Sequence, residues 1–144
     1  MKKIGEYTIR GRVEQNTTER ITLFDGRFDT GYKVTSIRIG PDSPYGNFDV
    51  FMCAKTEDDG YAGEKWDWEN NVQIAWAAWT ADGIGGMNAD QGIVDPDNLI
   101  VEDLYLSAGE NQNGAGCNYL ITMEKYEFSD WNGALAMVRN RSQS

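Results

Sequence analysis

The stretch Phe48-Asp49-Val50-Phe51-Met52-Cys53-Ala54 decides the fold, because both of its alternating faces are largely apolar. Successive side chains of a β-strand point to opposite faces of the sheet, so a strand that is wet on one side alternates apolar and polar residues. Here Phe51 and Cys53 oppose an equally apolar row on the other face. Residues 71–79 show the same pattern. We therefore expect two central strands, each covered on both faces, in at least two packed layers.

Further strand candidates lie on either side of these two. Residues 7–13 alternate, and residues 20–24 end at a turn signal, Asp25-Gly26. Residues 32–39 change phase midway, which is typical of a bulge. The last strong candidates are residues 99–106 and 118–128, whereas the Gly- and Asp-rich stretch 80–98 shows little that indicates regular structure.

The expected fold is therefore all-β, an antiparallel β-sandwich of jelly-roll-like form, in a single domain spanning residues 1–144. No helical pattern long enough for a crossover separates the strands, which favours antiparallel sheets. Sixteen Gly, seven Tyr, five Trp and five Phe fit short strands joined by tight turns. Cys53 and Cys117 are expected to be buried, reduced thiols that pack as small apolar residues.

The charge of the chain narrows the classes of partner. Thirteen basic and 23 acidic residues give a formal net charge of −10. Such a surface repels nucleic-acid phosphates and anionic lipid, so neither partner is expected. No apolar run long enough to cross a membrane and no secretory signal pattern is present, so no membrane association is expected.

The sequence contains no histidine, and this absence is its most informative feature about possible catalysis. Histidine is the usual general base near neutral pH, and the Ser-His-Asp and Cys-His arrangements require it. Only carboxylates remain, with candidate pairs at Asp67 and Glu69 or at Glu102 and Asp103. Chance pairs are expected in so acidic a chain. We therefore expect a protein that is not an enzyme and needs no cofactor.

Two oxygen-rich loops raise the question of calcium. They are Glu57-Asp58-Asp59-Gly60 and Asp95-Pro96-Asp97-Asn98. Neither follows the spacing of a twelve-residue calcium loop. Asp, Asn and Gly are also the residues that tight turns favour. Turn chemistry is thus the preferred interpretation, and no metal ligands are assigned.

Tyr61, Trp66 and Trp68 form a candidate interface or glycan platform. In an extended segment Trp66 and Trp68 share one side, with Asp67 between them. Exposed aromatic rings of this kind can stack on sugars. The alternative is that these rings cover the edge of the core or a subunit interface, where Trp is enriched. The sequence leaves both interpretations open.

Residues 130–144 differ in character from the rest. Ser129 or Asp130 is a good helix N-cap, and Trp131, Leu135 and Val138 would share one side of a short C-terminal helix. Arg139 and Arg141 would follow at its negative end. The same apolar, Arg-tipped segment could instead be a tail that docks on a neighbouring chain.

Four segments of the sequence resemble segments of small structural proteins encoded by tailed phages of marine bacteria, including cyanophages. These segments are residues 24–34, 94–105, 123–126 and 131–140. The resemblance implies a component of the virion and assigns no site residues. Its position in the particle, whether capsid, neck or tail, stays open.

Together these observations lead to two main functional hypotheses, with a carboxylate-based hydrolase as a third that ranks below them. The first is a non-enzymatic capsid decoration or cement subunit, located in the virion, that self-associates as a homo-oligomer and binds other virion proteins such as the major capsid protein. The alternative is a glycan-binding β-sandwich module used in host adsorption. A defined oligomer in solution would favour the first, and exposed Trp66 and Trp68 in a monomer would favour the second.

Overall fold

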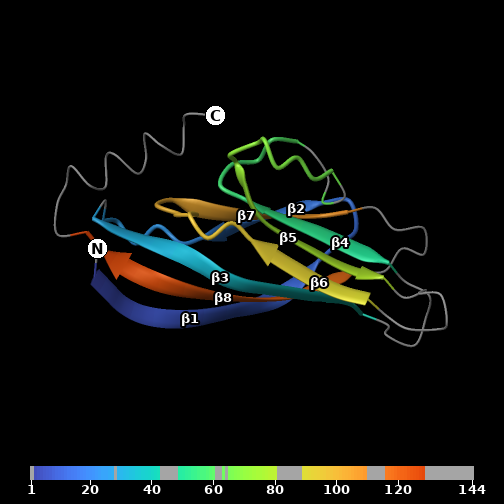
Figure 1. The fold of residues 1–144 in the computed structure, drawn as a ribbon, viewed down its shortest axis with the longest axis horizontal. Helices are drawn as coiled ribbons and strands as arrows, with labels where there is room; N and C mark the ends of the chain where they lie inside the picture. Colours follow the sequence, from blue (N-terminus) through green and yellow to red (C-terminus); the bar gives the residue numbers. More distant parts are fainter. Residues whose placement is uncertain are drawn as a thin grey trace.

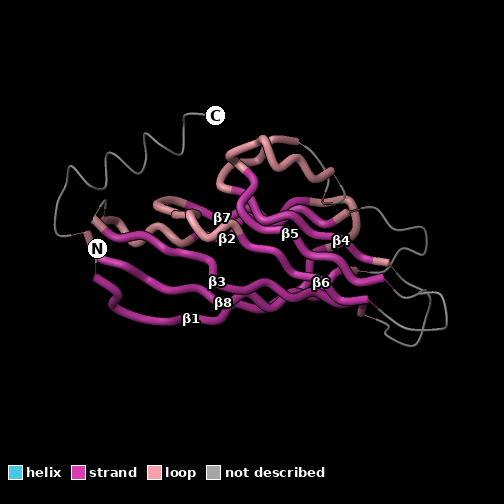
Figure 2. Tube along the Cα trace, in the orientation of Figure 1, coloured by secondary structure: helices cyan, strands magenta, loops and turns pink. Residues whose placement is uncertain are grey.

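A computed structural model describes residues 2–27, 29–42, 49–60, 63, 65–80, 89–109 and 116–128. Within these ranges the chain forms strands and no helix (Figures 1 and 2). The strands are β1 (Lys2–Val13), β2 (Thr18–Thr22), β3 (Thr30–Pro41), β4 (Val50–Lys55), β5 (Gln73–Thr80), β6 (Ala89–Val94), β7 (Asp103–Ala108) and β8 (Cys117–Glu127). The expectation of an all-β chain is confirmed for this part of the molecule.

The strands form two antiparallel sheets. The first has three strands in the order β1-β8-β3, and the second has five in the order β2-β7-β4-β5-β6. Every neighbouring pair of strands is antiparallel. In Figure 1 the two sheets lie as separate layers, with β1, β8 and β3 on one side and the five-stranded sheet on the other. The arrangement is sandwich-like, as the doubly apolar strands predict.

One hydrophobic core fills the space between the layers. The three-stranded sheet contributes Val34, Ile37, Ile121 and Met123, and the five-stranded sheet contributes Val50, Met52, Leu104 and Leu106. All of them are buried, and burial of such side chains is the main favourable term in folding.

The other face of β4 and β5 is also covered, as the sequence predicts. Cys53 and Trp76 point away from the core, yet Cys53 is fully buried and Trp76 is only 6% exposed. The described residues between β4 and β5, namely 56–60, 63 and 65–72, fold back over this face (Figure 1). At Gly63 an added Cβ would lie 2.2 Å from the Ser107 carbonyl oxygen, so only glycine allows this close approach. The segment is therefore an integral part of the fold.

The expected bulge in residues 32–39 is confirmed. The register of β3 against β8 shifts between Val34 and Ser36, which leaves Thr35 as the extra residue. The Thr35 hydroxyl donates to the Thr122 carbonyl at 3.1 Å. The bulge allows Val34 and Ile37, which stand three positions apart, both to point into the core.

The expectation for residues 80–98 is wrong in part, because β6 lies within that stretch. Ala89-Asp90-Gln91-Gly92-Ile93-Val94 lacks the alternation of a typical strand, but it forms a ladder with β5. At Gly92 an added Cβ would lie 2.1 Å from the Ile37 carbonyl oxygen of β3. Glycine at this point is thus what allows β6 to pass close to β3. The expected C-terminal helix or tail, residues 130–144, lies outside the described residues.

Candidate functional site

Gln73, at the start of β5, organises the segment that carries the candidate aromatic platform. Its side chain is buried, and its Nε2 donates to the Lys65 carbonyl at 3.1 Å. Its Oε1 accepts from the Asp67 N–H at 2.9 Å and from Trp76 Nε1 at 2.8 Å. A buried amide that satisfies three partners in this way holds the loop in one conformation.

The two tryptophans of the platform lie at different depths. Trp66 is half-buried, and its Nε1 donates to the Gly63 carbonyl at 2.6 Å. Trp68 is 68% exposed, the largest exposure among the big apolar side chains in the described ranges. Its ring leans on the buried Trp76, with centroids 6.0 Å apart and planes at 60°. Of the two described aromatic residues of the platform, Trp68 is therefore the more accessible, and Tyr61 lies outside the described residues.

A buried ion pair anchors the same segment. The Lys55 side chain has no solvent exposure, and its Nζ forms a hydrogen-bonded ion pair with Asp59. The other oxygen of Asp59 accepts from the Asn70 amide at 3.2 Å. A lysine can remain buried when its charge is paired and hydrogen-bonded. This cluster joins the two ends of the loop and gives Asp59 a structural role.

The two oxygen-rich loops adopt tight turns. Asp58 Oδ1 accepts from the Gly60 N–H at 3.1 Å, and Gly60 has a positive φ of 80°. Asp95 Oδ1 accepts from the Asp97 N–H at 3.0 Å. Among the residues that the structure describes, no group of three or more Cys, Asp or Glu side chains is placed to hold a metal ion. The geometry here is that of Asx turns.

One carboxylate of each candidate pair is engaged in local structure, whereas Glu69 and Glu102 are exposed. Asp67 Oδ1 accepts from the Glu69 N–H at 3.0 Å, which closes a turn on the surface. Asp103 is buried, and its oxygens accept from Arg20 Nε at 2.7 Å and from the Leu23 N–H at 3.3 Å. Its role is therefore to fix β2 and the following residue against β7.

Both thiols are free and buried, as the sequence predicts. Burial raises the pKa of Cys53 to about 12 and that of Cys117 to about 12. A thiol is a nucleophile only as the thiolate, so neither sulfur is activated.

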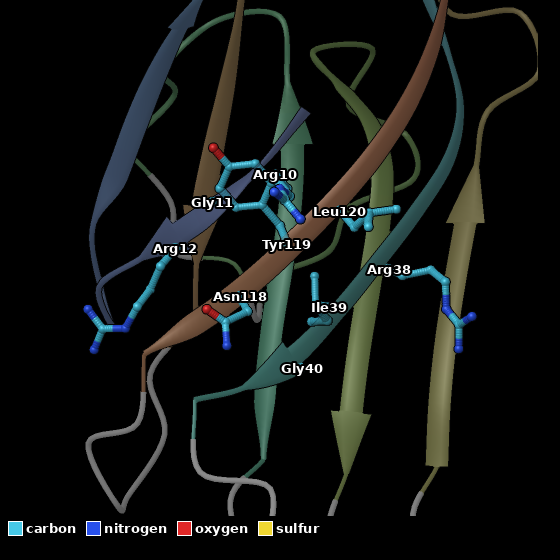
Figure 3. Close-up of a pocket in the computed structure, with 9 residues that line it drawn as sticks. All are labelled: Arg10, Gly11, Arg12, Arg38, Ile39, Gly40, Asn118, Tyr119 and Leu120. Atoms are coloured by element: carbon cyan, nitrogen blue, oxygen red, sulfur yellow. The ribbon is translucent and has the colours of Figure 1, made fainter. Parts of the chain in front are cut away.

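A second surface, on the outer face of the three-stranded sheet, carries a shallow hollow of about 640 Å³ (Figure 3). The registers place Arg10 opposite Leu120 and Leu120 opposite Arg38. We call Arg10, Leu120 and Arg38 the outer row. Leu120 is 43% exposed between the two arginines. This is an apolar centre with a basic rim on an acidic protein.

The cations around the hollow differ in their partners. Arg38 forms an ion pair with Asp90 at 2.6 Å, and Arg12 forms one with Asp42 at 2.7 Å. Arg10 is exposed and has no acidic partner within the described part of the chain. The sequence indicates Arg10 and Arg12 as basic residues of the first strand. It gives no signal that Leu120 and Arg38 complete the row, because that depends on the register of three strands.

No helix among the described residues is long and apolar enough to cross a membrane. A scan against protein-family models finds no match to the chain. No curated protein matches it either.

Proposed function

We propose that this chain is a non-enzymatic structural protein of a tailed-phage virion, specifically a capsid decoration or cement subunit. It acts by associating with itself and by binding the shell formed by the major capsid protein. The sequence segments that resemble marine phage structural proteins motivate the proposal. The connectivity of the two sheets is the observation that carries it.

That connectivity supports a jelly roll, a fold that is frequent in viral capsid proteins. An eight-stranded jelly roll can be described as one long hairpin rolled into two sheets. Its first strand pairs with the eighth, the second with the seventh, the third with the sixth and the fourth with the fifth. In this chain β1·β8, β2·β7 and β4·β5 form such ladders. The departure is β6, which pairs with β5 and contacts β3 through the Arg38–Asp90 ion pair.

The surface chemistry supports assembly rather than catalysis. Paired Asp103, paired Asp59 and the buried thiols all serve the fold. By contrast, the outer row presents Leu120, which is 43% exposed, between Arg10 and Arg38. An apolar centre with a charged rim is the usual composition of a protein interface.

The test is co-sedimentation with particles of the encoding phage prepared without this protein. We expect saturable binding at a fixed number of copies per particle and a shell that withstands higher temperature. Protein that stays in the supernatant at all concentrations would contradict the proposal. A variant that ends at residue 128 tests the tail carrying Trp131, Leu135, Val138, Arg139 and Arg141, and it should bind the shell more weakly.

A glycan-binding module for host adsorption is a second candidate, and Trp68 favours it. Its ring is 68% exposed on a loop fixed from beneath by Gln73 and Trp76. Clear hits on a glycan array that disappear in Trp68→Ala would support this alternative. Binding that survives the substitution, or no hits at all, would remove it.

A further inference from the structure

The two edges of the three-stranded sheet differ in how much of each is covered by other parts of the chain. At the β3 edge, Tyr32 and Ile100 exchange backbone hydrogen bonds of 2.8 and 2.7 Å, and the Asn98 side chain binds both backbone groups of Val34. Further along, β6 passes close to Ile37 at Gly92. The β3 edge is thus occupied over most of its length.

No described strand pairs with the outer edge of β1. β1 runs for 12 residues, and within the described ranges β8 is its one ladder partner (Figures 1 and 2). Alternate N–H and C=O groups of an edge strand point away from its neighbour and can pair with another strand. Most of β1 is exposed, including Tyr7 at 49% and Ile4 at 42%. Charged side chains, bulges and proline protect such an edge from pairing. In β1 the bulge lies near the start, between Lys3 and Gly5, and the strand beyond it is regular and contains no proline.

The segment Gly5-Glu6-Tyr7-Thr8-Ile9-Arg10-Gly11 is complementary to itself when read in reverse. Two copies related by a two-fold axis perpendicular to the sheet must pair with a residue opposite its own equivalent, because facing residues share a side of the sheet. With Thr8 at the centre, Glu6 faces Arg10 of the second copy, and Tyr7 faces Ile9 of the second copy. The two glycines also face each other.

Each of these pairs is favourable on its own face. Glu6, Thr8 and Arg10 are exposed, and Thr8 and Arg10 share the outer face with their neighbours on β8, Thr122 and Leu120. Opposite charges and aromatic–β-branched pairs stabilise directly facing positions of antiparallel strands. The unpaired Arg10 would gain a carboxylate, since Glu6 binds Lys3 through one oxygen only.

Other registers lose this match. Centred on Tyr7, Glu6 would face Thr8 and Ile9 would face Gly5. Centred on Ile9, Arg10 would face Thr8 and Tyr7 would face Gly11. Glu6 would then face Arg12, which already has Asp42 and Glu14 as partners. Both arrangements leave Arg10 without an acid opposite it, and both place an apolar side chain opposite a glycine.

We propose that two copies of this chain pair β1 with β1 about a two-fold axis through Thr8. The proposal names the self-interface of the assembly function given above and in that respect rests on it. The two three-stranded sheets become one continuous sheet of six strands. Because the axis is perpendicular to the sheet, both outer rows lie on the same side of the dimer. The dimer therefore presents Leu120 and its flanking arginines twice on one face.

Disulfide trapping tests the register directly. In Thr8→Cys the two introduced thiols would lie on facing residues, whose Cα atoms are about 4.5–5.5 Å apart in antiparallel strands. That separation suits a disulfide. The matched control is Thr122→Cys, since Thr122 lies beside Thr8 on the same face but one strand further in. Its Cα would be about 14 Å from its equivalent, three strand spacings away. Mild oxidation should cross-link Thr8→Cys and leave Thr122→Cys as single chains.

Charge exchange tests the Glu6–Arg10 pairs. Glu6→Arg and Arg10→Glu should each weaken the dimer by about tenfold, because each substitution places like charges opposite one another twice. The double variant restores opposite charges and should dimerise like the wild type, and an equimolar mixture of the two single variants should form mixed dimers. Glu19→Arg, an exposed position on β2, is the control and should leave dimerisation unchanged.

The outcomes separate this interface from the broader proposal. An oligomer that persists in Arg10→Glu, with no cross-link in Thr8→Cys, would overturn the β1 interface and leave self-association intact. A double variant as weak as the single variants would also overturn it. A wild-type protein that is monomeric yet binds particles would overturn it while the virion role stands.

Discussion

The Asn98 side chain forms two hydrogen bonds with the backbone of Val34, much as a neighbouring strand would. Its Oδ1 accepts from the Val34 N–H at 2.8 Å, and its Nδ2 donates to the Val34 carbonyl at 3.0 Å. Asn98 is 5% exposed. One amide thereby occupies the β3 edge at Val34, next to the Tyr32–Ile100 bridge, and contributes to the difference between the two edges of the three-stranded sheet.

Asn98→Ala should lower the free energy of unfolding by about 2–3 kcal/mol, because it leaves two buried backbone groups without partners. Chemical denaturation monitored by tryptophan fluorescence measures the change. Asp97→Ala, on the exposed side of the same turn, is the matched control and should cost much less. An equal loss of stability in the two variants would show that the hydrogen bonds to Val34 do not stabilise the fold specifically.

Gly92→Ala should destabilise the protein by about 1–3 kcal/mol through steric overlap. The added methyl would lie 2.1 Å from the Ile37 carbonyl oxygen, which belongs to the backbone of β3 and cannot rotate away. Gly40→Ala is the control, because nothing lies within 4 Å of its added Cβ. Thermal unfolding of both variants measures the difference. Equal melting temperatures would contradict the close approach of β6 and β3.

Asp25 should make the free energy of unfolding depend on pH in the acid range. The hydrogen bond from Lys125 at 2.8 Å, with further bonds from the Arg27 N–H and the Thr30 hydroxyl, lowers the pKa of Asp25 to about 2. A carboxyl whose pKa is depressed in the folded state contributes stability above its unfolded pKa, about 3.8, and loses it as the pH falls. The contribution of Asp25 is thus complete above about pH 4 and lost towards pH 2.

Asp25→Asn should therefore be less stable than the wild type at pH 7, and the two proteins should converge as the pH approaches 2. The free energy of unfolding, measured by urea titration at a series of pH values, gives both curves. Lys125→Met should reproduce the loss at pH 7, because it removes the main partner of Asp25. A constant gap between wild type and Asp25→Asn across the range would refute this role for the carboxylate.

Truncation of Trp68 and truncation of Trp76 should lower the stability of the protein by very different amounts. Trp76→Ala removes a ring that is 6% exposed and should cost about 3–5 kcal/mol of stability. Trp68→Ala removes a ring that is 68% exposed and should change stability by less than about 0.5 kcal/mol. Denaturant titration of both variants is the measurement. A large loss in Trp68→Ala would mean that the ring is structural and not available to a ligand.

Patterns within a single strand were the part of the fold that the sequence could predict. The doubly apolar faces around Val50 and Ala77 indicated two layers, and the phase change after Val34 indicated the bulge. The strand β6 could not be predicted, because it is defined by contacts with β5 and by the space at Gly92.

Contacts between segments that are far apart in the chain likewise cannot be predicted from the sequence. Asn98 binds a backbone 64 residues away. The outer row depends on the register of β1, β8 and β3, so its members could not be grouped from sequence spacing. The sequence indicates Trp68 as a candidate, but its exposure relative to that of Trp66 depends on how Gln73 fixes the loop.

The mass of the wild-type protein in solution tests the central claim of self-association most directly. Light scattering on the chromatographed protein, at a series of concentrations, measures it without a label or a partner. One chain has a mass of 16.2 kDa. A species of two chains, or of an even number of chains, is the predicted result. A mass of one chain at every concentration would contradict it.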